Sequence, residues 1–352
     1  MNIFCYPYRG LVLAIVIGLG LGKNIFAQSL PNPYRAVNGW AKMPEGRPMG
    51  AVGDLTMDPD GKHLWAIVRC TATDPKQFGT ECIDSDLDPV LKFDLQGNVV
   101  KSFGGGMFIW PHGIDVDREG NVWVTDAVSV KKTPPGGKRG QQVVKFSPEG
   151  KVLLTLGTPG VPGNSPTNFD VPSDVVIAPN GDIFVADGHS FDAGNNRIVK
   201  FSKDGKFIKA WGKTGYAPGE FRMPHAIAMD SKGRLFVADR GNNRIQIFDQ
   251  EGKFLAQWTQ FGRPSGICFD DKGQIYVADS ESDNVENPGW EMGIRVGDAQ
   301  TGWATAFILY PWGDPREIPG TGAEFVAVDR DGNLYGGEPR PRNIQKYIRV
   351  RP

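Results

Sequence analysis

The sequence predicts an all-β protein, a six-bladed β-propeller, because one strand-turn-strand pattern occurs six times along its 352 residues. Each copy has an anchor residue, an alternating apolar strand, a turn glycine eight positions after the anchor, and a second strand. Such alternation, rich in Val, Ile, Phe, Tyr and Trp, is typical of strands rather than helices. The anchors lie 40 to 61 residues apart, which suits four-stranded antiparallel blades. They are Gly53, His112, Ser173, His225, Ser265 and Glu324.

Within each copy the strands follow a fixed order. The first strand ends in a D-x-x-G or P-N-G turn, where glycine tolerates a positive φ angle. The second strands read HLWAIV, NVWVTD, DIFVAD, RLFVAD, QIYVAD and NLYGGE. Third strands such as VLKFD and fourth strands such as FIKAWG come next, but the fifth copy is irregular there.

The N-terminal segment 37–44, VNGWAKMP, is similar to the fourth strands, and the last copy has no fourth strand after it. We therefore expect residues 37–44 to complete the sixth blade and close the ring. Closure removes the exposed sheet edges that would otherwise pair with other chains.

Composition and charge exclude several classes of protein. Hydrophobic residues make up 40% and charged residues 22% of the chain, values that exclude a disordered chain and a multi-span membrane protein. The formal net charge of −1 gives no electrostatic footprint for nucleic acid or anionic lipid.

Residues 1–27 have the pattern of an export signal. Arg9 precedes an apolar run over 11–21, and Ile25-Phe26-Ala27 fits a cleavage site, so we expect cleavage after Ala27. A membrane anchor is the alternative, but the run is far shorter than the roughly 20 residues that a helical span needs. We expect residues 28–352 to form one propeller domain, a secreted or periplasmic monomer that is not bound to a membrane.

Export places the cysteines in an oxidising compartment. Cys70 and Cys82 lie in one polar insertion and could form a disulfide that closes a small loop, the alternative being two free thiols. Cys268 lies in an apolar run and is expected to be a buried hydrophobic residue.

Strand direction assigns residues to the two faces of the ring. The start of each first strand and the end of each second strand lie on the same face, because the two strands are antiparallel. The long insertions 70–89, 128–138, 158–172 and 280–319 also open on that face. We expect this loop-rich face to carry the function.

Three anchors suggest a metal site. His112, His225 and Glu324 start blades two, four and six, so they converge on the channel at intervals of about 120°. Two imidazoles and one carboxylate suit zinc or another divalent metal. The alternative is that Pro-His is a recurrent turn and Glu324 an ordinary carboxylate of the rim.

Three further residues follow second strands on the same face. Arg69 and Arg240 follow those of opposed blades, and a guanidinium fork suits a carboxylate of a small-molecule or peptide substrate. His189 follows the second strand of blade three and could act as a base, since its unperturbed pKa is about 6.5. The alternatives are structural ion pairs for the arginines and an exposed loop imidazole.

The segments VADGH and MPHAIAMDSKGRLFVADRGNNRIQIFDQEGKFLAQW look like NHL repeats. From about residue 37 to 347 the chain resembles the peptidyl-α-hydroxyglycine α-amidating lyase family. The resemblance implies a six-bladed propeller, a zinc ion held by three histidines at the anchors of alternate blades, two arginines after second strands, and a tyrosine after Asp-Gly. Carried over, His112 and His225 are zinc ligands, and Arg69 and Arg240 are the arginines.

The chain departs from the family at three positions. Glu324 occupies the position of the third histidine, and His189 occupies that of the tyrosine. The family's calcium ligand, an Asp, is Phe325 here, so calcium remains an alternative without its side-chain ligand.

These observations leave three functions open. The first is a metal-dependent lyase similar to the amidating lyase, with His189 as its base. The second is a hydrolase that uses the same site and metal-bound hydroxide. The third is an NHL module that binds protein or glycan through the loop-rich face and has no catalytic activity.

Overall fold

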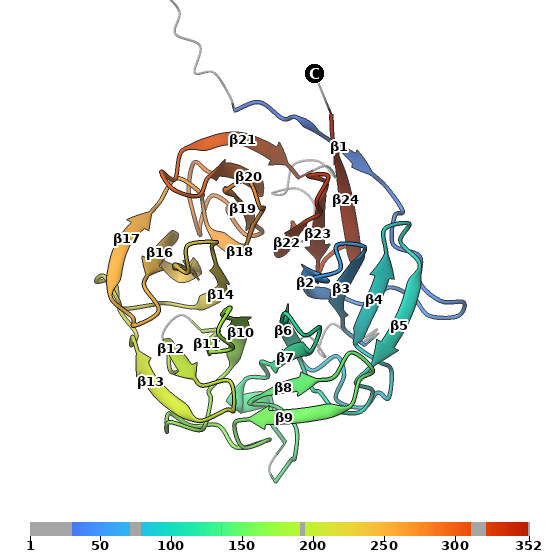
Figure 1. The fold of residues 1–352 in the computed structure, drawn as a ribbon, viewed down its shortest axis with the longest axis vertical. Coiled ribbons are helices and arrows are strands. Elements are labelled where there is room, and N and C mark those ends of the chain that lie inside the picture. Colours follow the sequence, from blue (N-terminus) through green and yellow to red (C-terminus); the bar gives the residue numbers. More distant parts are fainter. Residues whose placement is uncertain (1–29, 71–78, 135, 191–193, 311–321, 351–352) are drawn as a thin grey trace, which may run out of the picture.

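The structure, a computed structural model, describes residues 30–70, 79–134, 136–190, 194–310 and 322–350. They form six antiparallel sheets of four strands each, arranged as a ring around a central channel (Figure 1). The predicted all-β, six-bladed propeller is therefore confirmed. The predicted signal segment 1–27 lies outside the described residues.

In blades one to three the strands run from the channel outward in chain order. Blade one has β2 (Val52–Met57), β3 (His63–Val68), β4 (Val90–Asp94) and β5 (Val99–Phe103). Blade two has β6 (Pro111–Val116), β7 (Val122–Asp126), β8 (Gln142–Phe146) and β9 (Val152–Leu156). Blade three has β10 (Pro172–Ile177), β11 (Ile183–Asp187), β12 (Arg197–Phe201) and β13 (Phe207–Trp211).

Blades four to six continue the ring. Blade four has β14 (Pro224–Met229), β15 (Leu235–Asp239), β16 (Arg244–Phe248) and β17 (Phe254–Trp258). Blade five has β18 (Pro264–Phe269), β19 (Gln274–Asp279), β20 (Gly293–Asp298) and β21 (Ala304–Leu309). Blade six has β22 (Phe325–Val328), β23 (Leu334–Glu338) and β24 (Asn343–Arg349), with β1 (Tyr34–Val37) outermost.

The sixth blade is closed by the N-terminal strand, as predicted, but by different residues. β1 pairs with β24 from Tyr34↔Arg349 to Val37↔Lys346, so the closing strand precedes the predicted segment 37–44 and shares only Val37 with it. The reason is a turn at Gly39, whose φ angle of 65° ends the strand. Beyond it the Trp40 ring packs on Tyr335, with ring centroids 4.8 Å apart.

Blade five is more regular than the sequence suggests. Its strands β20 and β21 lie inside the stretch 280–319 that is predicted to be an irregular insertion. Their residues alternate less clearly because Gly293, Arg295 and Gly297 occupy strand positions.

The turns between first and second strands explain the repeated D-x-x-G. In five blades the turn aspartate accepts a hydrogen bond of 2.9–3.1 Å from the backbone N–H two residues later. The glycine three residues after it has a φ angle of 67° to 83°. This conformation is strained for other residues, so the glycine fixes the hairpin. The aspartates are Asp58, Asp117, Asp230, Asp270 and Asp329.

Apolar side chains fill the layers between neighbouring blades. Between blades one and two, for example, the Phe103 ring lies between Trp65 and Phe146, with centroids 5.5 Å and 5.0 Å apart. Burial of such large rings is the main stabilising contribution in a fold that has no single central core.

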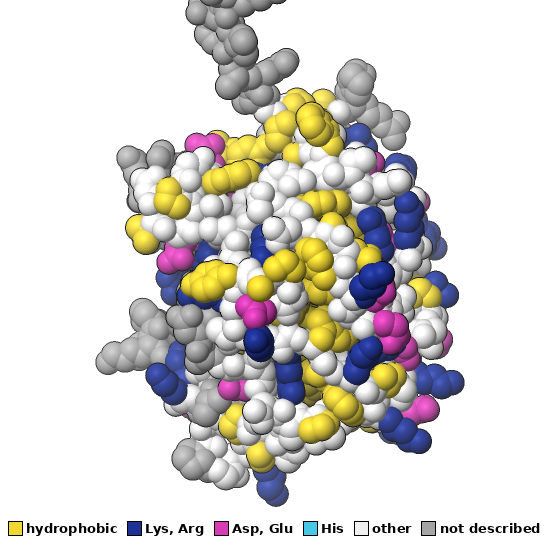
Figure 2. Space-filling view, turned by 90° about the vertical axis from the view of Figure 1, so that its left-hand side faces the viewer, with side chains coloured by type: hydrophobic (Ala, Val, Ile, Leu, Met, Phe, Trp, Pro, Cys, Tyr) yellow, Lys and Arg dark blue, Asp and Glu magenta, His cyan; other side chains and the backbone are white. Residues whose placement is uncertain are grey.

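The outer rim of the ring has apolar side chains and charged side chains of both signs. Figure 2 shows one side of it, where apolar side chains lie among lysines, arginines and acids without a field of one sign. The helices of the described residues are the short 3-10 turns η2 (Val130–Lys132) and η3 (Arg240–Asn242), and none of them has the length and apolarity needed to cross a bilayer.

Candidate metal and substrate site

One end of the channel gathers the predicted site residues. His112 and His225 are the second residues of β6 and β14, and Glu324 directly precedes β22. The strand pairs Pro111↔Asp126 and Pro224↔Asp239 place the ends of second strands at this same end. Both histidines are fully buried and Glu324 is 8% exposed, so the group lies inside the channel rather than on its rim.

The structure brings together four possible metal ligands. One ligand atom from each of His112, His189, His225 and Glu324 lies within 4.8 Å of the others. The three imidazole centroids are mutually 4.8 Å apart. The predicted ligands thus converge, and His189, predicted as a base, lies among them.

Backbone hydrogen bonds fix how two of these rings present their nitrogens. The Nδ1 atoms of His112 and His225 lie 2.8 Å from the carbonyl oxygens of Ser173 and Ser265. Because a carbonyl can only accept, each Nδ1 carries the hydrogen and each Nε2 keeps its lone pair. Both Nε2 atoms are buried and have no hydrogen-bond partner among the described residues. Metal-binding histidines are commonly oriented in this way.

Burial and charge keep the cluster in the state that a metal requires. Burial lowers the pKa of His112, His189 and His225 well below the usual value, and nearby arginines lower it further. The imidazoles are therefore neutral near pH 7. Burial alone would raise the pKa of Glu324, but the positive charges of Arg240 and Arg69 act against burial, so the pKa is lowered and the carboxylate is ionised.

The pair of His225 and Glu324 has the arrangement that a cation site would require. His225 Nε2 lies 3.2 Å from Glu324 Oε1, yet no hydrogen bond joins them. A neutral ring whose Nδ1 holds the hydrogen faces a carboxylate with a lone pair, so two acceptors face each other. A divalent ion between such groups would remove this conflict.

Arg240, at the start of η3, supplies positive charge to the cluster. It is 2% exposed, and its NH1 donates to Glu324 Oε1 at 3.2 Å. Its NH2 lies 3.3 Å from His189 Nε2. The Met223 sulfur accepts from Arg240 Nε and NH2 at 3.1 Å and 3.0 Å. Arg240 is thus rigidly aimed at the site.

Sequence reasoning missed two residues that hold Arg240. Arg263 donates to the Arg240 carbonyl at 2.9 Å, and Glu281 Oε1 lies 3.5 Å from Arg240 NH1. Arg263 and Met223 each precede the proline that opens a first strand, as Trp110 does in blade two. That shared position beside the anchor is the signal that could have found Arg263, whereas Glu281 does not have it.

Arg69 lies on the opposite side of the cluster, and its guanidinium makes fewer hydrogen bonds than that of Arg240. It is 1% exposed, its Nε donates to the Pro111 carbonyl at 3.0 Å, and its guanidinium lies 4.8 Å from the Trp110 ring centroid. Its NH2 is buried with no hydrogen-bond partner among the residues that the structure describes. A buried guanidinium with a free donor is well placed to receive an oxyanion.

The predicted disulfide is present beside Arg69. Cys70 and Cys82 are bonded, with Cα atoms 4.9 Å apart. The bond tethers the segment directly after Arg69, although residues 71–78 of the enclosed loop lie outside the described part of the chain. Cys268 is a free cysteine that is half-buried, not fully buried as expected, and it lines the other end of the channel.

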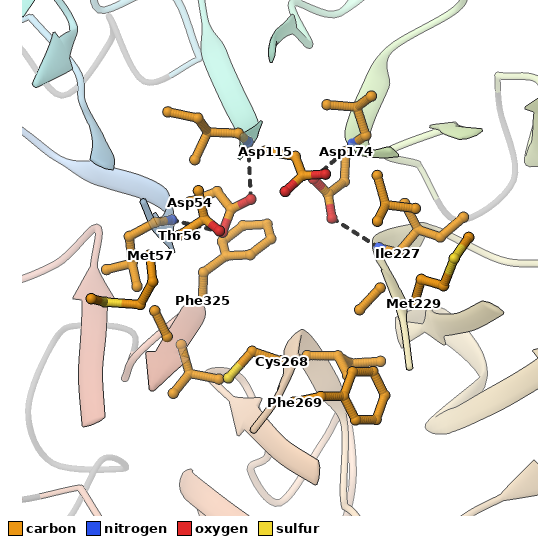
Figure 3. Close-up of a pocket in the computed structure, with 18 of the residues that line it drawn as sticks. Asp54, Thr56, Met57, Asp115, Asp174, Ile227, Met229, Cys268, Phe269 and Phe325 are labelled. Atoms are coloured by element: carbon orange, nitrogen blue, oxygen red, sulfur yellow. Dashed lines mark hydrogen bonds between the residues drawn. The ribbon is translucent and has the colours of Figure 1, made fainter. Parts of the chain in front are cut away.

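The other end of the channel is a cavity of ≈ 290 Å³ with three aspartates in its lining (Figure 3). The Phe325 ring divides it from the cluster, since its centroid lies 5.5 Å from that of His112 and 5.1 Å from that of His225. The resemblance described above implies a calcium ligand at this position, and the Phe325 side chain has no oxygen to supply one.

The aspartates of this cavity join neighbouring blades through backbone N–H groups. Asp54 accepts from Leu55 and Ile114 at 2.7 Å and 2.9 Å, and Asp174 accepts from Val175 and Ile227 at 2.7 Å and 2.8 Å. Asp115 accepts from Ile177 at 2.8 Å. Their oxygens are thus used in holding the ring together.

Comparisons with known proteins agree with this architecture. The NHL repeat model matches residues 221–248 and 261–285, in blades four and five, so the chain carries NHL repeats. The structure of a streptogramin B lyase superposes with a TM-score of 0.52 at 16% identity, over 89% of this chain and 96% of that one. At that identity the likeness shows the fold alone.

Two similar proteins are named as peptide-amidating enzymes. Peptidyl-glycine alpha-amidating monooxygenase B of Xenopus laevis is 39% identical over 215 residues, which are 54% of this chain and 22% of that protein. Peptidyl-alpha-hydroxyglycine alpha-amidating lyase 1 of Drosophila melanogaster is 32% identical over 270 residues, 72% of this chain and 47% of that protein. The chain thus spans less than half the length of either protein, and the resemblance predicted from the sequence is confirmed.

Proposed function

We propose that this protein is an exported, metal-dependent lyase similar to the peptidyl-α-hydroxyglycine α-amidating lyases. Its substrate would be a small carbinolamide with a carboxylate, and the reaction would cleave the bond between the carbinol carbon and the amide nitrogen. One observation carries this proposal. The imidazole and carboxylate groups that could bind a cation lie beside two arginines that could bind an anion.

His112 and His225 would hold the ion, zinc or another divalent metal, and the sequence assigns the third position to Glu324. The free, buried Nε2 atoms of the two histidines support this fit. When bound, such an ion acts as a Lewis acid and lowers the pKa of an oxygen ligand. The burial of His112, His225, Glu324 and both arginines strengthens the charge interactions among these groups.

Arg69 and Arg240 would hold the substrate carboxylate. Arg69 offers the unpartnered NH2, and Arg240 is fixed by Met223 and Arg263 on the other side of the cluster. Two fixed guanidinium groups orient a carboxylate and stabilise negative charge as the reaction proceeds.

The reaction needs a group that takes the proton of the carbinol hydroxyl. As the O–H bond breaks, its electrons form the carbonyl, the C–N bond breaks, and the amide nitrogen leaves with a proton. The products are an amide and a glyoxylate-like acid. Two groups of the cluster can accept the proton, namely His189, as the sequence predicts, and Glu324.

We propose export because of the sequence of residues 1–27 and the Cys70–Cys82 disulfide, which is typical of oxidising compartments. The mature protein would be the domain 28–352, a monomer in the secreted or periplasmic fraction. Sequencing the N-terminus of the exported protein tests the cleavage after Ala27.

The direct test of function is an assay with a peptidyl-α-hydroxyglycine. We expect glyoxylate release that stops after chelation and returns with zinc. A protein loaded with one equivalent of metal that does not turn this substrate over would contradict the lyase. Hydrolysis of a lactone or ester by that protein would favour the hydrolase, whereas glycan or protein binding without turnover would favour the NHL binding module.

A further inference from the structure

We infer that His189 is a ligand of the metal, so that three imidazoles from blades two, three and four hold the ion and Glu324 lies beside them. This inference rests on the metal site of the proposed function, and it changes which residues of that site are ligands. It assigns to His189 a nitrogen ligand position that the sequence gives to a base.

The first argument is the symmetry of the cluster. The ring centroids of His112, His189 and His225 form a triangle with three sides of 4.8 Å. Tetrahedral zinc at about 2.0–2.1 Å from each nitrogen needs these nitrogens about 3.4 Å apart, a separation that rings in such a triangle reach by small rotations. His189 is therefore as close to the common centre as the two anchor histidines are.

The second argument is the hydrogen bonding of His189. Its Nε2 faces an Arg240 nitrogen at 3.3 Å, and a guanidinium can only donate, so Nε2 has a lone pair. The neutral ring then carries its hydrogen on Nδ1, as in His112 and His225. All three rings thus offer Nε2. The contact with Arg240 is long, so a metal ion would displace a weak interaction.

The third argument is the state of Glu324. Its Oε1 already accepts from Arg240 NH1 at 3.2 Å, which ties the carboxylate to a fixed guanidinium. With three imidazoles as ligands, the ion would lie between the guanidinium groups of Arg69 and Arg240, and the carboxylate of Glu324 beside it would balance part of this positive charge.

The chain holds His189 in place through a close backbone contact. A Cβ at Gly188 would lie 2.6 Å from Asn196 Oδ1 and 2.7 Å from its backbone nitrogen, so only glycine fits there. Asn196 Oδ1 also accepts from the Met223 backbone N–H at 3.2 Å. On the other side, the Trp110 ring meets His189 edge-on with centroids 5.2 Å apart. The ring therefore enters the channel from a fixed support.

Metal titration separates the two assignments without an activity measurement. Apo-protein would be titrated with zinc against a chromophoric chelator, and with cobalt to record the visible absorption of the bound ion. The variants are His189→Phe, which keeps an aromatic ring against Trp110, and Glu324→Gln, which keeps shape and removes charge. His63→Ala is the matched control, because His63 lies in an exposed turn and contacts Asp60.

We expect His189→Phe to lower zinc affinity by at least about 100-fold and to change the cobalt spectrum, while Glu324→Gln stays within about 10-fold of wild type. Wild-type affinity in both His189→Phe and His189→Ala would overturn the inference and leave the proposed function intact. A wild-type protein that binds neither zinc nor cobalt would overturn both.

Discussion

The two ends of the channel are built from the same six inner strands and carry opposite chemistry. At the loop-rich end, imidazoles and arginines meet, and the Nε2 atoms of His112 and His225 and the NH2 of Arg69 have no hydrogen-bond partner among the described residues. At the other end, Asp54 and Asp174 are buried too, but each accepts two backbone N–H groups from two blades.

Whether a buried polar atom has a hydrogen-bond partner distinguishes functional from structural residues better than charge or burial does. A buried polar group without a partner costs stability, so a fold keeps one where a ligand supplies the partner. A buried carboxylate whose two oxygens each accept a backbone N–H is explained by the fold alone. We therefore propose that metal and substrate bind at the imidazole end, and we interpret the aspartates of the other end as braces between neighbouring blades.

The largest expected effect is loss of metal from the imidazole end. His112→Ala should lower zinc affinity at least about 100-fold, because it removes one of the nitrogen ligands that we propose. Equilibrium titration measures this, with His63→Ala as the unaffected control. Unchanged zinc binding in His112→Ala would show that this end does not hold the metal.

The next effect concerns the anion at the same end. Arg69→Met should lower kcat/KM for a substrate with a carboxylate by roughly 10- to 100-fold, since charged hydrogen bonds are lost. Arg69→Lys should recover only part, because an ammonium lacks the guanidinium fork. A substrate analogue that has a carboxamide in place of the carboxylate tests whether Arg69 recognises the carboxylate. If Arg69→Met slowed both substrates equally, the residue would not recognise the carboxylate.

The aspartate end should respond in stability and not in metal binding. Asp54→Ala leaves the buried N–H groups of Leu55 and Ile114 without acceptors, which should lower the free energy of unfolding by about 2–4 kcal/mol. Asp60→Ala, in an exposed turn, should cost less than about 1 kcal/mol. Urea denaturation measures both. A fall in zinc affinity of folded Asp54→Ala would break the division between the two ends.

The smallest expected effect is a pH dependence of stability. Burial raises the pKa of Asp115 to about 7, above the unfolded value of 3.8. The folded state therefore holds the proton more tightly, so this contribution to stability is complete below about pH 4 and is lost as the pH rises through 7. This contribution should decline from pH 5 to pH 8, while the lowered pKa values of His112, His189 and His225 act on stability in the opposite direction.

Asp115→Asn should remove part of that decline, because the amide oxygen can still accept from the Ile177 N–H. The remainder would come from Asp54 and Asp174, where burial also raises the pKa. Equal pH profiles for wild type and Asp115→Asn would contradict the role of Asp115.

The repeat made the fold predictable in detail. Alternation, turn glycines and anchor spacing fix six blades, and strand direction alone places His112, His225 and Glu324 at one end with Arg69 and Arg240. The closing strand was harder, because residues 34–37 and 37–44 have similar apolar patterns and only the turn at Gly39 separates them.

The sequence could not show which groups would be left without partners. The position of His189 among the anchor histidines depends on the path of the chain after β11, and the braces Asp54 and Asp174 depend on contacts between blades. Both are long-range properties, which neither spacing nor periodicity contains.

Anomalous X-ray diffraction at the zinc edge, from crystals grown with one equivalent of zinc, tests the central claim most directly. We expect a single peak among His112, His189 and His225, on the loop-rich side of the Phe325 ring. No peak there, or a peak among Asp54, Asp115 and Asp174, would contradict the account.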